Sequence, residues 1–161
     1  MLAGGSSHTD QYAASLRKNE TERIRIVDWL SGDALEEVLT NATLFVLPSD
    51  LEGMSLALLD AMGAGICVLT SDTPENREAV ADAGFTFNRG DVQDLQRMLT
   101  MLLNDDDLRR RTGRLAQERV RQHYLWDDVA KEIEALYLEL MHASAEIKAA
   151  PDAVRVTSKT A

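Results

Sequence analysis

Residues 44–80, LFVLPSDLEGMSLALLDAMGAGICVLTSDTPENREAV, decide the fold of this chain. Two continuous apolar runs, at residues 44–47 and 66–69, are typical of parallel strands that are buried on both faces. The stretch between them, residues 55–64, has the composition and the closing glycine of a helix. A strand, a helix and a second strand in this order predict a right-handed crossover onto a parallel sheet.

The same alternation continues on both sides of this stretch. Further strands are expected at residues 2–3, 24–27 and 85–87, and further helices after Thr9, Ser31 and Thr73, each of which can cap a helix. Three more helices are expected to follow without a strand between them, at residues 95–102, 108–120 and 129–140. The fold class is therefore α/β, a Rossmann-like parallel sheet flanked by helices, with a C-terminal run of helices. We expect one domain over residues 1–142 and a flexible tail over residues 143–161, where apolar content falls.

Composition and charge exclude several classes of protein. The apolar runs of the 161-residue chain are far shorter than the roughly 20 residues of a membrane helix, and the N-terminus lacks signal-peptide character. The expected location is the cytoplasm, with peripheral contact at the inner membrane face as a second option. A single cysteine excludes a disulfide framework, and three scattered histidines argue against a structural zinc site. The net charge of −10 repels nucleic acid, so no nucleic-acid partner is expected.

Ligands of open parallel sheets bind beyond the carboxyl ends of the strands, which selects the loops at residues 4–7, 28–31, 48–55 and 70–76. The third loop is the most informative. Gly53 lets the backbone approach a ligand, and the N–H groups of Met54, Ser55 and Leu56 at a helix start can hold a phosphate. Glu52 is an acceptor suited to hydroxyl groups. This combination fits a phosphate placed between polyols, as in a nucleotide-sugar.

Spacing alone leaves a second interpretation of these carboxylates open. Glu52 could complement the positive end of the helix dipole, and Asp60 could be an ordinary exposed carboxylate on the helix surface.

The stretch at residues 44–80 resembles the signature of the family 4 (group 1) glycosyltransferases, which are retaining enzymes of the GT-B fold. RIRIVDWLSGDALEEVLTNA at residues 23–42 is similar to the preceding strand, loop and helix of that family. AGFTFNRGDVQDLQRMLTMLLNDDDLRRRTGRLAQERV at residues 83–120 is similar to the part that follows. The resemblance covers residues 1–141 and is specific, because the motif, its flanks and their order all agree.

The resemblance implies transfer of a sugar from a nucleotide-diphosphate sugar to a glycan or lipid-linked acceptor, as in polysaccharide biosynthesis, with neither metal nor cofactor. The chain resembles the C-terminal, donor-binding half of such an enzyme. The acceptor domain would then lie on another chain or be missing from this one. The family's Arg and Lys that neutralise the diphosphate lie upstream of the first strand, so we expect the chain alone to bind a donor without turning it over.

The resemblance also assigns roles to individual residues. Glu52 takes the place of the first carboxylate of a Glu-x7-Glu motif and would hold hydroxyls of the donor sugar at the catalytic centre. Asp60 stands where the family has its second Glu, the ribose ligand, and is one methylene shorter. The remaining donor-binding positions are the amides of Gly53, Met54, Ser55 and Leu56, and the nucleobase loop with Asp28, Trp29 and Leu30. The alternative function is a non-catalytic nucleotide-sugar-binding or assembly module; an epimerase of the same fold is less favoured because no acid/base pair is placed for it.

Other chemically distinctive residues have simpler explanations. Cys67 lies inside an apolar strand and is expected in the core, and His8 is expected in a turn. Trp29 could either pack against the neighbouring helix or stack on a base. Arg109, Arg110, Arg111, Arg114, Arg119 and Arg121 are expected on a solvated face with acidic partners, and Met54, Met62, Met98 and Met101 are expected to fill the core.

Overall fold

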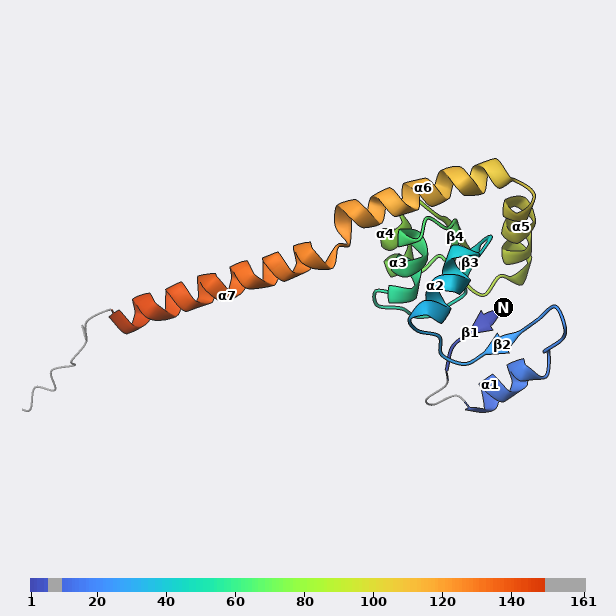
Figure 1. The fold of residues 1–161 in the computed structure, drawn as a ribbon, viewed down its shortest axis with the longest axis horizontal. Coiled ribbons are helices and arrows are strands. Elements are labelled where there is room, and N and C mark those ends of the chain that lie inside the picture. The colour runs from blue at the N-terminus through green and yellow to red at the C-terminus, as the bar shows by residue number, and fades with distance from the viewer. Residues whose placement is uncertain (6–9, 150–161) are drawn as a thin grey trace, which may run out of the picture. The chain divides into compact units, whose positions relative to one another are not determined.

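The computed structural model of the chain describes residues 1–5 and 10–149, which form two units, residues 1–119 and residues 120 onward. Figure 1 shows the order of the elements along the chain. The helix α6 crosses from the first unit into the second. The elements are β1 (Leu2–Ala3), α1 (Asp10–Arg17), β2 (Ile26–Val27), α2 (Asp33–Thr40), β3 (Phe45–Leu47), α3 (Leu56–Gly63), β4 (Val68–Ser71), α4 (Pro74–Val80), β5 (Phe85–Phe87), α5 (Val92–Leu103), α6 (Asp106–His123) and α7 (Trp126–Ala149).

All the described strands pair in parallel, which confirms the predicted α/β class. The strands β3, β4 and β5 form one sheet in the order β3-β4-β5, with Val46 opposite Leu69 and Thr70 opposite Thr86. The strands β1 and β2 form a second, two-stranded sheet. The strand predicted at residues 66–69 is shifted, because Ile66 and Cys67 precede β4 and the strand continues to Ser71.

The central strand β4 is buried along its whole length, as its continuous apolar run predicted. On one face, Cys67 and Leu69 pack with Phe87 of β5 and with Met98 and Leu102 of α5. On the other face, Gly84 fits so closely between Val68 and Val80 of α4 that a Cβ at this glycine would lie 2.8 Å from Val68. The core prediction is confirmed for Cys67, Met62 and Met98, whereas Met54 and Met101 are exposed, and the prediction for these two was wrong.

Side-chain caps fix the starts of two helices. Ser55 caps α3 by accepting a hydrogen bond from the Leu58 N–H at 3.3 Å, and Thr73 caps α4 by accepting from the Asn76 N–H at 3.2 Å. Ser31 does not cap α2, because the capping position is taken by Gly32, whose positive φ of 56° suits a glycine. The predicted cap Thr9 and the turn residue His8 lie outside the described residues.

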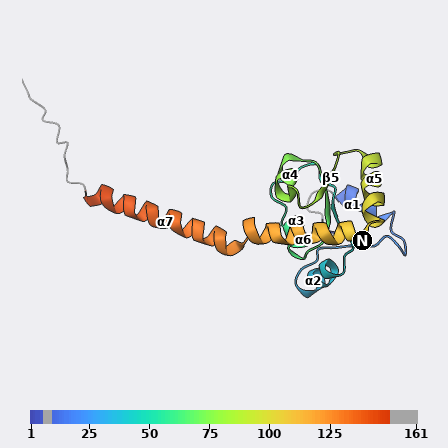
Figure 2. The same cartoon turned by 90° about the horizontal axis from the view of Figure 1, so that it is seen from above.

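Within the first unit, Gly113 of α6 lies against the backbone of Gly65 and Cys67, just before β4. Figure 2 shows α6 running past α3. The helix buries the small residues Thr112, Gly113 and Ala116 rather than Leu115, which is 55% exposed. Two long side chains of α6 also bind the ends of other helices. Gln117 Nε2 donates to the Gly63 carbonyl at 2.9 Å, and Arg119 Nε donates to the Ala79 carbonyl at 2.7 Å.

The basic run on α6 combines surface ion pairs with structural contacts to the main chain. Arg110 is exposed and pairs with Asp107 three residues earlier, as expected for a solvated face. Arg109 pairs with Asp106, but its side chain is only 12% exposed and also donates to the Leu102 carbonyl, so the prediction of a solvated face was wrong for Arg109. Arg119 also makes a structural contact, because its guanidinium donates to the Glu78 and Ala79 carbonyls at the end of α4, which lack N–H donors inside that helix.

The second unit consists of the end of α6 and the long helix α7. This helix continues to Ala149, past residue 142, where the tail was expected to begin, and residues 150–161 lie outside the described part. No helix in the described ranges combines the length and the apolar character needed to cross a membrane.

We predict that Gly113→Ala destabilises the chain even though alanine favours helices by about 1 kcal/mol. A Cβ at this position would lie 2.0 Å from the Gly65 carbonyl oxygen, so α6 must move away from β4. We expect the free energy of unfolding, measured by urea denaturation, to fall by about 1–3 kcal/mol. Gly5→Ala, in open space, is the control; equal stability of Gly113→Ala and the parent would contradict this packing.

Candidate functional site

The candidate site lies at the carboxyl edge of the sheet β3-β4-β5. Because the strands are parallel, residues that follow them meet at one edge. Residues 48–55 follow β3, Asp72 and Thr73 follow β4, and Asn88 and Arg89 follow β5. Hydrogen bonds between these segments, described below, confirm that they are neighbours.

The loop between β3 and α3 ends at a helix start with free N–H groups. Ser55 Oγ binds the Leu58 N–H, and the Leu59 N–H donates to the Ser55 carbonyl at 3.1 Å. The N–H groups of Leu56 and Ala57 at the first two helical positions have no acceptor within the helix. These groups, together with the positive end of the helix dipole, can bind an anion.

Of the two predicted carboxylates, Glu52 lies before the start of α3 and Asp60 lies within the helix. Glu52 is half-buried in the loop, three residues before the cap Ser55. Asp60 is exposed on α3. Neither carboxylate forms an ion pair within the described part of the chain, so both remain available as hydrogen-bond acceptors.

The remaining predicted donor-binding residues are accessible. Gly53 is exposed, as are the side chains of Met54 and Leu56 at 63% and 56%. Trp29 exposes 78% of its surface, so it does not pack into the core, and Leu30 is half-buried. Asp28 in the same loop pairs with Arg17 of α1.

A hollow of about 540 Å³ lies between α1 and the sheet β1-β2. It is lined by residues of both strands and of α1, together with Gly4, Gly5 and Asp28, whereas no residue of the loop at 48–55 lines it. This hollow is therefore distinct from the helix start at Leu56.

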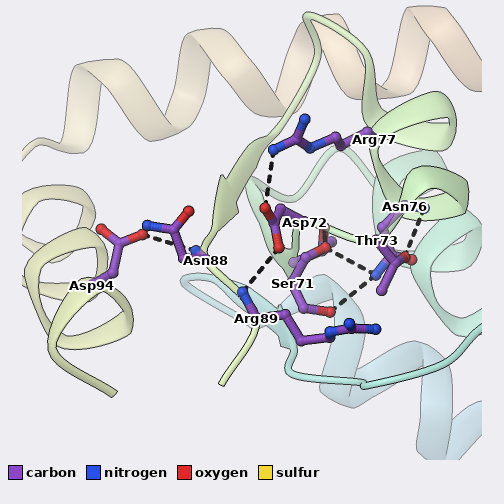
Figure 3. Close-up of polar contacts among 9 residues, drawn as sticks. Ser71, Asp72, Thr73, Asn76, Arg77, Asn88, Arg89 and Asp94 are labelled. Atoms are coloured by element: carbon purple, nitrogen blue, oxygen red, sulfur yellow. Dashed lines mark hydrogen bonds and ion pairs between the residues drawn. The ribbon is translucent and has the colours of Figure 1, made fainter. Parts of the chain in front are cut away.

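Polar side chains at the ends of β4 and β5 form a network (Figure 3), and two of them donate to carbonyls of the loop before α3. Ser71, at the end of β4, donates from Oγ to the Ser49 carbonyl. Arg89, after β5, donates from Nη1 to the Asp50 carbonyl at 2.8 Å. The sequence analysis selected the loop at 70–76, which contains Ser71, but assigned Ser71 no role, and it missed Arg89; the signal available was the position of each residue at or after the end of a parallel strand.

Asp72 links this network to α4 and β5. Its carboxylate accepts the Arg89 N–H at 2.9 Å through Oδ1 and the Arg77 guanidinium at 2.9 Å through Oδ2. The hydrogen bond from the Arg89 N–H lowers the pKa of Asp72 below its ordinary value, and Arg77 acts in the same direction. Asp72 therefore functions as a charged structural acceptor.

Neither a reactive thiol nor a metal-binding cluster is found at this edge among the described residues. Burial raises the pKa of the Cys67 thiol to about 11, which suits a core residue and not a nucleophile. Among residues 1–5 and 10–149, no group of three His, Cys, Asp or Glu side chains is placed to hold a metal ion.

Comparison with known proteins identifies the family. The family model described as "Glycosyl transferases group 1" matches residues 1–119, which is most of the chain. The chain belongs to the group 1 glycosyltransferase family. The match covers the loop at 48–55 together with Asp60, Asp72 and Arg89.

Named relatives agree with this family. The chain is 35% identical over 104 residues to a sulfoquinovosyl transferase of Arabidopsis thaliana, covering 60% of this chain and 20% of that protein. It is 29% identical over 153 residues to an alpha-maltose-1-phosphate synthase of Mycobacterium tuberculosis, covering 85% of this chain and 39% of that protein. The chain thus spans about a fifth to two-fifths of the length of these glycosyltransferase relatives.

A solved structure of the same fold is the sucrose-phosphate synthase of Thermosynechococcus elongatus. The superposition has a TM-score of 0.77 at 24% identity and covers 88% of this chain and 38% of that chain. The group 1 glycosyltransferase chain therefore has the fold of one Rossmann-like half of a GT-B enzyme, as the sequence predicted.

We predict that Asp72→Asn lowers stability at neutral pH and has less effect in acid. Because the pKa of Asp72 is lowered in the folded chain, its contribution is present at pH 7 and is lost as the pH falls below about 4 through that lowered pKa. Urea denaturation at pH 7 and at pH 3 should show a gap between parent and variant that narrows in acid. Asp82→Asn, at an exposed position, is the control; a gap that is equal at both pH values would contradict this role.

Proposed function

We propose that this chain binds the nucleotide-diphosphate sugar donor of a retaining glycosyltransferase that transfers the sugar to a glycan or lipid-linked acceptor. The observation that carries the proposal is the Ser55-capped start of α3, whose free N–H groups lie beside the half-buried carboxylate Glu52. Membership of the group 1 glycosyltransferases and the named relatives support the same class of reaction.

The anion-binding part of the proposed site consists of backbone groups. The N–H groups of Met54, Ser55 and Leu56 bind oxygens of the diphosphate, and the dipole of α3 stabilises their negative charge. Gly53 carries no side chain and lies in open space, so the ligand can approach the backbone closely. Backbone binding suits a chain whose net charge of −10 repels free anions.

The two carboxylates bind the hydroxyl groups on either side of the diphosphate. Glu52 accepts hydrogen bonds from hydroxyls of the sugar and orients the ring, and Asp60 accepts from the ribose. Asp60 is one methylene shorter than glutamate, so a water molecule can bridge its contact with the ribose. The exposed ring of Trp29, next to Leu30, is available to stack on the nucleobase.

Transfer requires stabilisation of charge that develops as the bond between the sugar and the diphosphate breaks. Negative charge grows on the leaving phosphate, where the helix amides stabilise it, while positive charge grows on the sugar ring near Glu52. The local side chains Asp50, Glu52 and Asp60 add no positive charge. We therefore propose that cations of an acceptor domain complete the site.

A non-catalytic nucleotide-sugar-binding or assembly module is the second candidate function. The observation that favours it is the exposed Asp60 at the position of the second glutamate, because a shortened ribose contact weakens donor positioning. This candidate keeps the binding of the donor and lacks the transfer step.

Donor binding is expected to depend on Glu52 more strongly than on Asp60. Loss of a hydrogen bond to a charged group costs about 1.5–3 kcal/mol, so Glu52→Gln should weaken affinity for the best-bound donor about 10- to 100-fold. Isothermal titration calorimetry with UDP-glucose, ADP-glucose and GDP-mannose measures this, and the smaller effect of Asp60→Asn. Glu37→Gln, at an exposed position of α2, is the control. If Glu52→Gln bound every donor like the parent chain, the role of Glu52 in holding the sugar would be wrong.

The chain of 161 residues is expected to bind a donor without transferring its sugar. The reason is that Asp50, Glu52 and Asp60 add negative charge near the helix start, while the guanidiniums at this edge, Arg77 and Arg89, are bound to Asp72 and to the Asp50 carbonyl. A radiolabelled-donor assay with glycan and lipid-linked acceptors should give no transfer above the rate without protein. A substantial rate from the chain alone would show that its own residues complete the catalytic centre.

A further inference from the structure

Two backbone carbonyls of the loop before Glu52 are held by donors from outside the loop. The Ser49 carbonyl accepts from Ser71 Oγ, and the Asp50 carbonyl accepts from Arg89 Nη1 at 2.8 Å. The donors stand at the ends of β4 and β5, so the two neighbouring strands fix the path of the chain just before Glu52.

The first donor, Ser71, is itself fixed. Its exposed fraction is only 1%, and Asn76, which is equally buried, donates from Nδ2 to the Ser71 carbonyl at 3.1 Å and to Ser71 Oγ at 3.3 Å. Asn76 is held in turn at the Thr73-capped start of α4. Ser71 Oγ therefore accepts a hydrogen bond from the fixed Asn76 amide (Figure 3) and donates its own proton to the Ser49 carbonyl.

The second donor, Arg89, is fixed through its backbone. Its N–H group binds Asp72 Oδ1, and Asp72 is held on its other oxygen by Arg77. The guanidinium at the end of the exposed Arg89 side chain donates to the Asp50 carbonyl, 39 residues earlier in the sequence. The Arg89 main chain is held at the edge of the sheet by Asp72, whereas the Arg89 side chain binds the loop.

The position of Asp50 decides where Glu52 can lie. Two residues extend over at most about 7 Å, so a fixed Asp50 carbonyl confines Glu52 and the amides that follow it to a small region. Displacement of a binding group by about 1 Å can reduce its effect about 100-fold. A loop that is exposed to solvent needs such anchors in order to present its groups in one arrangement.

We propose that Arg89 is a positioning residue for the donor loop, holding Glu52 and the N–H groups of residues 53–56 in place through the Asp50 carbonyl. This inference rests on the proposed function for the identity of the ligand, but the restraint on the loop is a property of the chain alone. Arg89 acts through the backbone, and the anion is bound by the helix amides.

Arg89→Met tests this proposal, because it removes the guanidinium and keeps the N–H group that binds Asp72. Hydrogen–deuterium exchange of peptides covering residues 49–58 should become about 10-fold faster in the ligand-free chain. Affinity for the best-bound of UDP-glucose, ADP-glucose and GDP-mannose should fall about 10-fold in the same variant. Arg89→Lys should restore most of both, since its ammonium group can donate to the same carbonyl.

Arg110→Met is the matched control, because it removes an equal charge from an exposed ion pair on α6 and should change neither measurement. Unchanged loop exchange in Arg89→Met would overturn the proposal, as would weaker donor affinity with unchanged exchange, which would make Arg89 a direct ligand of the anion. Failure of the parent chain to bind any nucleotide-sugar would contradict the proposed function instead, while the exchange measurement still decides whether Arg89 holds the loop.

Discussion

Burial of β4 on both faces is the constraint on which the candidate site depends. All four residues of this strand are buried, and α3, α4 and α5 pack around the sheet that it centres. A strand confined in this way cannot change its register without moving apolar side chains into water. Ser71 and Asp72 therefore emerge from the sheet at fixed positions, and the loops before α3 and after β5 are built against them.

The sequence was sufficient to predict the fold class and the helix start at the site. Continuous apolar runs mark β3 and β4, while Ser55 and the pair Thr73-Pro74 mark helix starts through local hydrogen-bond chemistry. The contact of Arg89 with Asp50 could not be predicted in this way, because its partners are 39 residues apart and meet only after the sheet forms. The buried face of α6 also depends on a tertiary contact, because the close approach to Gly65 requires Gly113 there and leaves Leu115 exposed.

The charge distribution explains why the site is built from backbone groups. Acidic side chains outnumber basic ones by ten in this chain. At this edge, Arg77 binds Asp72, and Arg89 binds the Asp50 carbonyl. Helix N–H groups provide positive potential without a side chain whose charge could be lost to a neighbouring carboxylate. Glu52 forms no ion pair in the described part of the chain, and in the proposed site it accepts hydroxyl groups of the sugar.

The anchors of the loop bind its carbonyl groups and leave its side chains free. Had Ser71 and Arg89 bound the Asp50 or Glu52 carboxylates, the loop would be equally ordered, but the groups suited to hydroxyl ligands would be occupied. Hydrogen bonds to the main chain of Ser49 and Asp50 restrict the backbone before Glu52, and the Ser55 cap restricts it afterwards. The residues between these restraints include Gly53, which leaves the surface open. The backbone of the loop is thus restrained while its side chains stay available, as the proposed binding of a donor requires.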